Sequence, residues 1–206
     1  MAIPSLILGS ASPGRAMIFK RLGLQFQVDP SRIDEESVVE PVPSRRAELL
    51  AKLKAEDVAA RHPDAVVIGC DSVVETASGV LLEKPVDAAD AKRMLELLSG
   101  KSALCHSGMC VVGMGKTAVG LCTTEVTFCP LTPQMIDWWI AQGGWQGCAG
   151  AFQIEGRCQL IISRIKGDFT SVVGLPVYVL GQLLREVGYP LWETAAWPEP
   201  IRLEAK

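Results

Sequence analysis

The chain contains 206 residues, of which 49% are hydrophobic and 21% are charged, and its formal net charge is −3. This size and apolar content predict a globular α/β protein with a substantial core, built as one domain or as two closely merged lobes. The acidic balance argues against a nucleic-acid partner, which needs a broad basic surface. A small anionic substrate remains compatible, because it requires only a local group of Lys and Arg.

Neither membrane attachment nor secretion is expected. No apolar run is long enough to span a bilayer, and the first residues enter a strand-like run without the basic segment or cleavage site of a signal peptide. The seven cysteines are odd in number and form no Cys-x-x-Cys pair, and neither His62 nor His106 completes a zinc-ligand spacing with them. We therefore expect reduced thiols in a cytoplasmic protein that has no membrane partner.

Strand-like runs alternate with helical patterns along the chain, as is typical of α/β proteins. The expected strands are 6–8, 65–69, 109–112, 119–128 and 160–165, and the expected helices are 15–22, 44–62, 88–98, 132–142 and 177–187. Gly113-Met114-Gly115 is expected to be the turn of a hairpin. The segment after Gly188 is rich in Pro and Trp, so we expect a domain at 1–190 followed by a loosely attached tail at 191–206.

The sequence Ser12-Pro13-Gly14-Arg15 follows the first strand and predicts the start of a helix. Ser is a preferred N-cap residue and Pro is preferred at the next position, while a helix N-terminus offers N–H donors and a partial positive charge to a phosphate. Arg15 falls in the first turn, where a cation opposes the helix dipole and a nearby anion would remove the conflict. The alternative is an ordinary capped helix with Arg15 in solvent.

Lys54 lies inside the apolar arc of the expected helix 44–62, whereas Lys52 lies on its solvent side. Lysine is rarely buried without a partner. Lys54 is therefore either a cation that binds a ligand or one half of a structural ion pair with Asp57, which lies three residues further on the same arc.

Acidic residues occur at two further places. Asp71 comes just past the end of a buried strand, where ligands collect in open α/β sheets, so it is a candidate metal ligand or general base. The alternative is an Asp that only forms a turn. Asp34-Glu35-Glu36 is either a solvated loop or a group able to hold a divalent cation.

Several of these features recur in a fixed order that resembles the Maf nucleotide pyrophosphatase family over 6–188. In chain order they are Ser10-x-Ser12-Pro-x-Arg15, Asp34-Glu35, Leu53-Lys54-Ala55, Gly69-x-Asp71-Ser-Val-Val, Lys84-Pro85, Leu98-Ser99-Gly100-Lys101 and Val173-Gly174-Leu175-Pro176. The resemblance implies an elongated mixed sheet with helices, as in Maf and ITPase-like proteins, with two lobes around a central cleft. It also implies a homodimer.

The same resemblance implies an activity and roles for individual residues. The expected reaction is hydrolysis of a nucleoside triphosphate to a nucleoside monophosphate and pyrophosphate, with Mg²⁺ or Mn²⁺ as cofactor. Asp71 matches the catalytic base, and Glu35 and Asp71 match the metal ligands. The residues expected to bind the substrate are Ser10, Ser12, Arg15, Lys54 and Lys84. Such a site has a physical reason, because cations and a metal must neutralise the triphosphate as its α-phosphorus is attacked.

The chain departs from the family pattern at Gly14, where a second basic residue is usual, at Glu83, where Gly is usual, and at Ala103, where His is usual. In this family the substrate base follows the residues matched by Gly14, Ser72 and Glu155. Ser72 is similar to the members that act on dTTP and UTP. Glu155 is similar to those that act on 7-methyl-GTP, and Gly14 is similar to neither group.

Glu155 favours a guanine-type or modified nucleotide, because a carboxylate only accepts hydrogen bonds and suits the N–H donors of guanine. Gly14 offers no ring to stack on a methylated, cationic base. Glu155 could instead turn away and pair with Arg157 or a lysine, which would leave a dTTP/UTP pyrophosphatase. A hypothesis of another class is a protein that binds nucleotide without turnover and regulates cell division.

Overall fold

The computed structural model describes residues 3–194, which form a seven-stranded mixed sheet with helices packed on it. The strand order is β2-β1-β3-β5-β6-β7, and β4 pairs with β3 beside this path. The strands are β1 (Leu6–Leu8), β2 (Phe26–Val28), β3 (Val66–Thr76), β4 (Leu81–Leu82), β5 (Ser102–Gly113), β6 (Lys116–Phe128) and β7 (Ile162–Lys166). The helices are α1 (Pro13–Arg21), α2 (Pro43–Arg61), α3 (Ala88–Leu98), α4 (Pro133–Ala141), α5 (Phe169–Val173), α6 (Val177–Val187) and α7 (Leu191–Thr194), with short 3₁₀ helices at Ala149–Ala151 and Arg157–Ile161.

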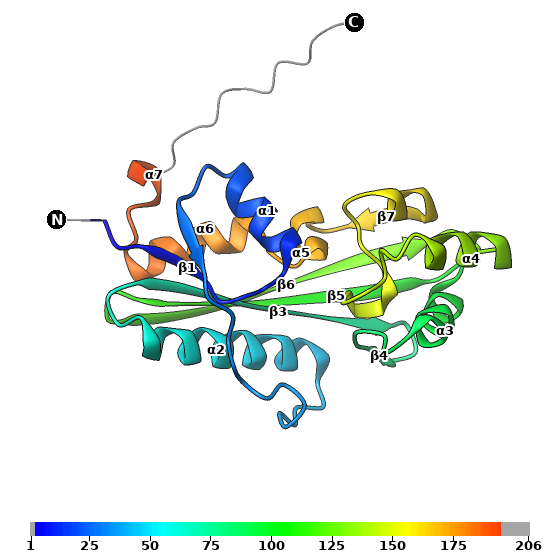
Figure 1. Ribbon diagram of the computed structural model, residues 1–206, viewed down its shortest axis with the longest axis horizontal. Coiled ribbons are helices and arrows are strands. Elements are labelled where there is room, and N and C mark those ends of the chain that lie inside the picture. The colour runs from blue at the N-terminus through cyan, green and yellow to red at the C-terminus, as the bar shows by residue number, and fades with distance from the viewer. Residues whose placement is uncertain (1–2, 195–206) are drawn as a thin grey trace, which may run out of the picture.

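The molecule is elongated along the three long strands β3, β5 and β6 (Figure 1). At one end, α2 covers one face of these strands while α1 and α6 cover the other, and α3 and α4 lie at the opposite end. The buried apolar side chains follow this division, with one cluster beneath α1 and α6, one beneath α3 and α4, and one beneath α2. The elongated mixed sheet with two lobes that the sequence predicts is therefore confirmed.

Two glycines let α2 approach the sheet unusually closely. A Cβ atom at Gly69 of β3 would collide with the carbonyl oxygen of Ala51, and one at Gly108 of β5 would collide with that of Ala47. Small residues on both surfaces thus bring the helix backbone against the strands, as glycine permits at points of close approach. This packing sets the distance between α2 and the sheet, and therefore how far the side chains of α2 reach along β3.

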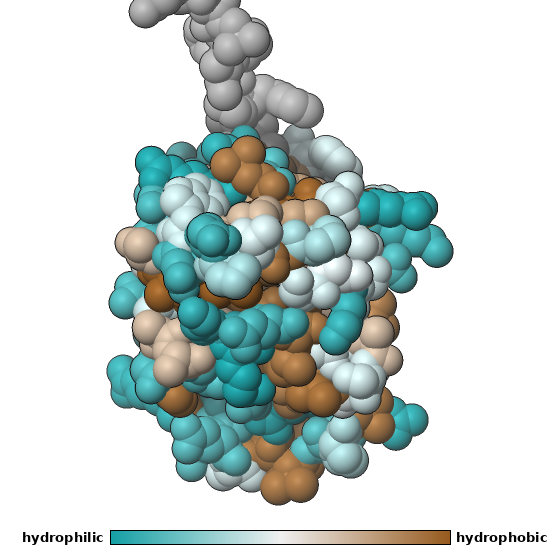
Figure 2. All heavy atoms as spheres, turned by 90° about the vertical axis from the view of Figure 1, so that its right-hand side faces the viewer, coloured by the Kyte–Doolittle hydropathy of each residue, from teal (hydrophilic) through white to brown (hydrophobic). Residues whose placement is uncertain are grey.

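The far end of the molecule, which carries α3, α4 and β7, buries its large apolar side chains inward. Phe128 and Phe152 form an edge-to-face pair with ring centroids 5.1 Å apart, and the Trp139 indole donates to the Ala151 carbonyl at 2.9 Å. Hydrophobic residues on the outer surface of this end lie in small groups between hydrophilic ones (Figure 2). This lobe therefore has a core of its own beside the one at the α1 end.

Asp71 is not past the end of its strand, and that expectation was wrong. β3 continues to Thr76 because β5 pairs with it throughout, from Val67 opposite Val112 to Thr76 opposite Ala103. On its other edge, β3 pairs with β1 only up to Ile68 and with β4 only from Val74. Asp71 thus lies within a strand, beside a stretch of open sheet edge.

Smaller differences concern short or irregular segments. β5 starts at Ser102 rather than at 109, and β7 is displaced to Ile162–Lys166 because a 3₁₀ helix precedes it. β2, β4, α5 and α7 were not expected. The hairpin turn at Gly113-Met114-Gly115 is confirmed, with positive φ at Met114 and Gly115.

The first residues of the expected tail form a short helix. Residues 191–194 form α7, and Leu191 packs against the core cluster beneath α6. The remainder of the tail, 195–206, lies outside the described residues. Across 3–194, none of the helices combines the length and the apolar character needed to cross a membrane.

Candidate active site

A cleft of about 690 Å³ lies at the open edge of β3, between the two lobes. The cleft is lined by the N-terminus of α1, the loop after β2, part of α2, the middle of β3, the segment after β4, part of β5, the loops that precede and follow Phe152, and α5. All ten residues singled out from the sequence line this one cleft, namely Ser10, Ser12, Gly14, Arg15, Glu35, Lys54, Asp71, Ser72, Lys84 and Glu155. The structure therefore brings the expected site residues together, although they are spread over most of the chain.

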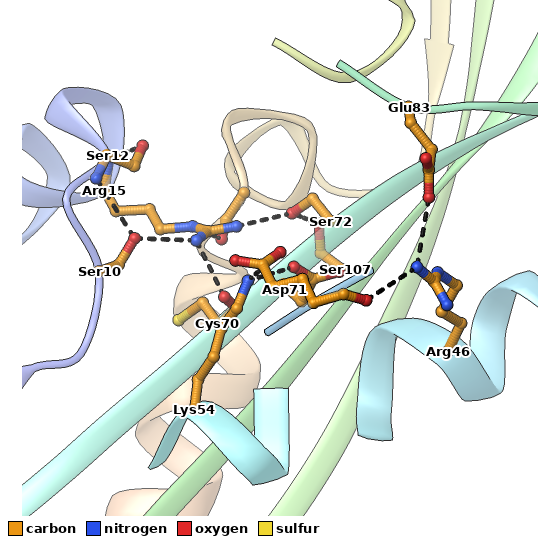
Figure 3. A network of polar contacts seen from close by, with 12 residues as sticks. Ser10, Ser12, Arg15, Arg46, Lys54, Cys70, Asp71, Ser72, Glu83 and Ser107 are labelled. Atoms are coloured by element: carbon orange, nitrogen blue, oxygen red, sulfur yellow. Dashed lines mark hydrogen bonds and ion pairs between the residues drawn. The ribbon is translucent and has the colours of Figure 1, made fainter. Parts of the chain in front are cut away.

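Arg15 is fixed in place rather than free in solvent. Ser12 caps α1 by accepting from the Arg15 amide at 3.4 Å, and the side chain turns back over the edge of β3. Nε donates to the Gly174 carbonyl at 2.9 Å, Nη1 to Ser10 Oγ at 3.0 Å and to the Cys70 carbonyl at 2.9 Å, and Nη2 to Ser72 Oγ at 3.2 Å (Figure 3). The guanidinium is thus held at the wall of the cleft with its charge uncompensated by any of these neutral acceptors.

The Ser10 hydroxyl group is arranged to donate into the cleft. Its oxygen accepts hydrogen bonds from Arg15 Nη1 and from the Ser12 amide, at 3.0 and 3.3 Å. A serine hydroxyl has two acceptor lone pairs and one hydrogen, so both lone pairs are engaged. The hydrogen is left for an acceptor such as a phosphate oxygen.

Lys54 holds two carboxylates together. Its side chain is only 7% exposed, and Nζ lies 2.6 Å from Asp71 Oδ1 and 2.9 Å from Glu35 Oε2. The alternative pairing with Asp57 is wrong, because that carboxylate pairs with Arg61 Nη1 at 2.7 Å. The apolar arc therefore identified Lys54 correctly as a buried lysine with ionic partners.

Electrostatics keep Glu35 ionised. Partial burial would raise its pKa, but the hydrogen bond and charge of Lys54, together with the charges of Lys84 and Arg15, hold the pKa below its ordinary value. Three cations therefore act on the same carboxylate. Lys84 itself lines the cleft from the exposed segment after β4.

A chain of hydroxyl groups supports this arrangement from below. Ser107 Oγ donates to the Ser171 carbonyl at 2.6 Å, so the 2.8 Å contact between Ser72 and Ser107 must be donated by Ser72. Ser72 also accepts from Arg15, which connects the guanidinium to β5 and α5 through the fully buried Ser107 and Ser171. The Ser72 hydrogen is thus engaged, and the side chain can only accept from a ligand.

Ser107 and Ser171 could not be identified from the sequence, because their roles depend on how the strands pair and pack. Ser107 lies opposite Ser72 in the β3–β5 pairing, and the sequence shows only a serine beside an apolar run. Arg46, whose guanidinium binds Glu83 (Figure 3), was not expected in the site either. Arg46 carried a usable signal, since it is a cation in the first turn of α2, the same conflict that drew attention to Arg15.

The Glu155 carboxylate lies directly against Gly14 in the cleft. A Cβ atom on Gly14 would overlap with Glu155 Oε1, so the missing side chain provides the room that the carboxylate occupies. Arg157 donates to Gln142 Oε1 and not to Glu155. Within residues 3–194, Glu155 makes no ion pair, so the expectation that it could turn away toward Arg157 is not met.

Glu35 and Asp71 fit a divalent cation that is shared with a substrate. Residues 3–194 contain no cluster of three or more His, Cys, Asp or Glu side chains placed to bind a metal unaided. However, Mg²⁺ in nucleotide sites usually takes one or two carboxylates and completes its shell with waters and substrate phosphates. Glu35 and Asp71 supply the two carboxylates of this donor set, and the three cations of the cleft can bind the substrate phosphates that would complete it.

Comparisons with known proteins agree on one family. A family model described as "Maf-like protein" matches residues 5–187. The chain is 42% identical over 189 residues to a dTTP/UTP pyrophosphatase of Moorella thermoacetica, covering 91% of this chain and 97% of the relative. It is 37% identical over 194 residues to a 7-methyl-GTP pyrophosphatase of Rhizobium johnstonii, with 90% and 97% covered. It is 32% identical over 204 residues to a nucleoside triphosphate pyrophosphatase of Rippkaea orientalis, with 97% and 98% covered.

Among solved structures, a HAM1 protein from Coxiella burnetii is similar with a TM-score of 0.41 and 15% identity. The match covers 61% of this chain and 73% of that one.

Proposed function

The chain belongs to the Maf family, and on this premise we propose that it hydrolyses nucleoside triphosphates between the α- and β-phosphates. The products are a nucleoside monophosphate and pyrophosphate. The observation that supports this reaction is the convergence of Arg15, Lys54 and Lys84 with Glu35 and Asp71 in one cleft. A binding site for a neutral or cationic ligand would not need three cations on its walls.

The cations neutralise the triphosphate, most strongly when charge builds up on the leaving pyrophosphate. The Ser10 hydroxyl hydrogen, Arg15 and the N-terminus of α1 lie on one wall of the cleft, where they can bind phosphate oxygens. Lys54 and Lys84 supply positive charge from α2 and from the segment after β4. Because Arg15 and Lys54 are already fixed by protein acceptors, their positions do not depend on the nucleotide.

Asp71 acts as the base. Lys54 occupies its Oδ1 atom, which leaves Oδ2 to accept a proton. As the oxygen of a water molecule bonds to the α-phosphorus, the bond to the bridging oxygen breaks, and pyrophosphate takes the electron pair. The water proton passes to Asp71. Glu35 and Asp71 would hold a Mg²⁺ or Mn²⁺ ion, which, when bound, supplies further charge neutralisation on the phosphates.

The substrate base is a guanine or a modified guanine, selected by Glu155. The Glu155 carboxylate has no cationic partner within residues 3–194 and lines the cleft. A carboxylate can accept from both the N1–H and the N2–H₂ of guanine, whereas uracil and thymine offer one N–H between two carbonyl acceptors. The relatives named above include one enzyme for dTTP/UTP and one for 7-methyl-GTP, and further similar relatives are more often named dTTP/UTP pyrophosphatase. A dTTP/UTP pyrophosphatase is therefore the alternative.

The reaction is tested by measuring pyrophosphate release from 7-methyl-GTP, GTP, UTP and dTTP with Mg²⁺ or Mn²⁺. Turnover of at least one nucleotide, with nucleoside monophosphate as the second product, is expected. Nucleotide binding without release of pyrophosphate from any of the four would overturn the proposed reaction. That result would favour the non-catalytic regulator.

The choice of base is tested with Glu155→Gln and Gly14→Ala. Gln replaces an acceptor by a group that also donates, so it should lower kcat/KM for guanine nucleotides relative to UTP. A methyl group at Gly14 should displace the flexible Glu155 carboxylate and shift the ranking the same way, with the helix intact. If UTP or dTTP is the best wild-type substrate and neither variant changes the ranking, Glu155 does not select the base, although the reaction itself stands.

A further inference from the structure

The loop that carries Glu35 has no regular structure of its own. It runs from the end of β2 at Val28 to the start of α2 at Pro43. Near its beginning, it is attached to α2 through Arg61, whose Nη2 donates to the Pro30 carbonyl at 3.0 Å, and through Asp57, which accepts from the Arg32 amide at 2.9 Å. These contacts lie before Glu35, so another contact must fix the part of the loop that presents its carboxylate to Lys54.

Arg46 provides that contact. Its Nη2 donates to the Glu35 carbonyl at 3.3 Å, and its Nη1 donates to the Val38 carbonyl. The two carbonyls bracket the turn in which the Val38 amide bonds back to the Glu35 carbonyl at 3.4 Å. A guanidinium with donors in a fixed planar fork therefore holds both ends of the turn that begins at Glu35.

The Arg46 side chain is largely buried, unlike that of an arginine which only contacts solvent. Its side chain is 13% exposed, and its Nε is the one buried side-chain polar atom within residues 3–194 that has no hydrogen-bond partner. Leaving such a donor unpaired in the interior is unfavourable, because the group loses its hydrogen bonds to water without gaining another. The neighbouring Arg45 is exposed, so a cation in the first turn of α2 can lie in solvent without leaving a buried donor unpaired. The buried position makes sense if the contacts of Arg46 serve the cleft.

The same guanidinium reaches the segment that carries Lys84. Arg46 Nη2 lies 3.3 Å from Glu83 Oε1 (Figure 3). The Glu83 carbonyl accepts from the Gly150 amide at 3.1 Å. The Glu83 carboxylate is therefore drawn toward Arg46. Its negative charge is compensated there and does not oppose the binding of phosphates by the adjacent Lys84.

We propose that Arg46 is a positioning residue that fixes the Glu35 loop and, through Glu83, the segment of Lys84, so that both side chains face the same substrate. Arg46 acts through these two residues and touches no reacting group. Its role rests on the proposed function, because Glu35 and Lys84 matter for catalysis only if a triphosphate is the substrate.

The first experiment does not depend on activity. Hydrogen–deuterium exchange of peptides covering residues 33–40 is compared in wild type, Arg46→Met and the matched control Arg45→Met, after thermal unfolding has shown that each variant is folded. Exchange in this segment should become faster by on the order of tenfold in Arg46→Met and stay unchanged in Arg45→Met. Unchanged exchange in a folded Arg46→Met protein would overturn the proposed role. If Arg46→Met does not fold, Arg46→Lys replaces it, since a lysine keeps the charge but cannot donate to both carbonyls in one plane.

The second experiment separates positioning from a general structural effect. Arg46→Met should lower kcat/KM by on the order of tenfold or more, because small displacements of catalytic groups are costly. In a Glu35→Gln background the same substitution should cost much less, since the loop then has no carboxylate to place. Glu83→Gln should have an effect of less than about fivefold, because the Glu83 side chain is 61% exposed and its ion pair with Arg46 is therefore weak.

The possible failures are distinguishable. Full multiplicative losses in the double variant would show that Arg46 does not act through Glu35, while wild-type turnover would leave the proposed function intact. Absence of wild-type turnover would remove the proposed function, whereas the exchange experiment would still show whether Arg46 fixes the loop.

Discussion

Replacing Lys54 by Met tests the central electrostatic feature of the site. At an effective dielectric constant of about 20, the attraction between Lys54 and Asp71 across 2.6 Å is about 6 kcal/mol before desolvation. Desolvation of the buried ions offsets much of this gain, but removing Lys54 leaves Asp71 buried and unpaired beside a second carboxylate. Breaking a buried pair in this way costs about 3–5 kcal/mol. We expect a loss near 3 kcal/mol, because the Glu35 side chain is 40% exposed and can turn toward water.

The measurement is the free energy of unfolding in urea at pH 7, with Lys52→Met as the matched control. Lys52 lies two residues away on the same helix and pairs with Glu56 at 3.8 Å, with both side chains about half exposed. Its replacement should cost less than about 1 kcal/mol. The double variant Lys54→Met/Asp71→Asn should be more stable than Lys54→Met alone, because one of the two unpaired charges is gone. Equal losses for the two lysine variants, or a double variant less stable than Lys54→Met, would refute the buried-pair interpretation.

Three further outcomes are expected. Asp71→Asn should lower kcat by on the order of 100-fold or more with the fold retained, as measured by pyrophosphate release and circular dichroism, since an amide cannot accept the proton. All seven cysteines should react with an alkylating agent in denaturant. In the native protein at pH 8, mass spectrometry should show that four of them react slowly. Burial raises the pKa of Cys70 to about 11 and the pKa values of Cys105, Cys110 and Cys158 to about 12. The folded-state pKa of Glu35 lies below its ordinary value of 4.5. The difference in the free energy of unfolding between wild type and Glu35→Gln should therefore be constant at higher pH and shrink as the pH falls below about 4.5. A difference that grows on acidification would contradict this expectation.

The sequence predicts well the elements whose ends carry strong local signals. The bounds of α3 and α6 agree with the expected 88–98 and 177–187. Asp87 caps α3 by accepting from Asp90, and Gly188 ends α6 in a left-handed conformation. By contrast, β2 and β4 contain only three and two residues, too few for a pattern of period two. The extent of β3 could not be predicted, because it is set by pairing with β5 and not by local preference.

The same division applies to the site. The apolar arc of α2 identified Lys54 as a buried cation, yet its partners could not be inferred from the helix. Asp71 meets Lys54 because Gly69 and Gly108 allow α2 to lie directly on the strands, and Glu35 meets it because Arg46 fixes an irregular loop. Both are consequences of tertiary packing. Residues chosen by family resemblance did converge in one cleft, whereas Ser107 and Arg46, which support them, had no counterpart in the motifs.

Two cations of the site, Arg15 and Lys54, depart from local folding preferences, and protein groups hold each of them in place. Arg15 opposes the dipole of α1 but is held by four neutral acceptors, and Lys54 is buried but is held by two carboxylates. Departures from local preference of this kind are expected at functional sites. Because protein acceptors hold Arg15 and Lys54, binding a triphosphate requires little ordering of these two cations. A preorganised arrangement of this kind favours the charge that develops during reaction, because the protein groups need not reorient as the bond breaks.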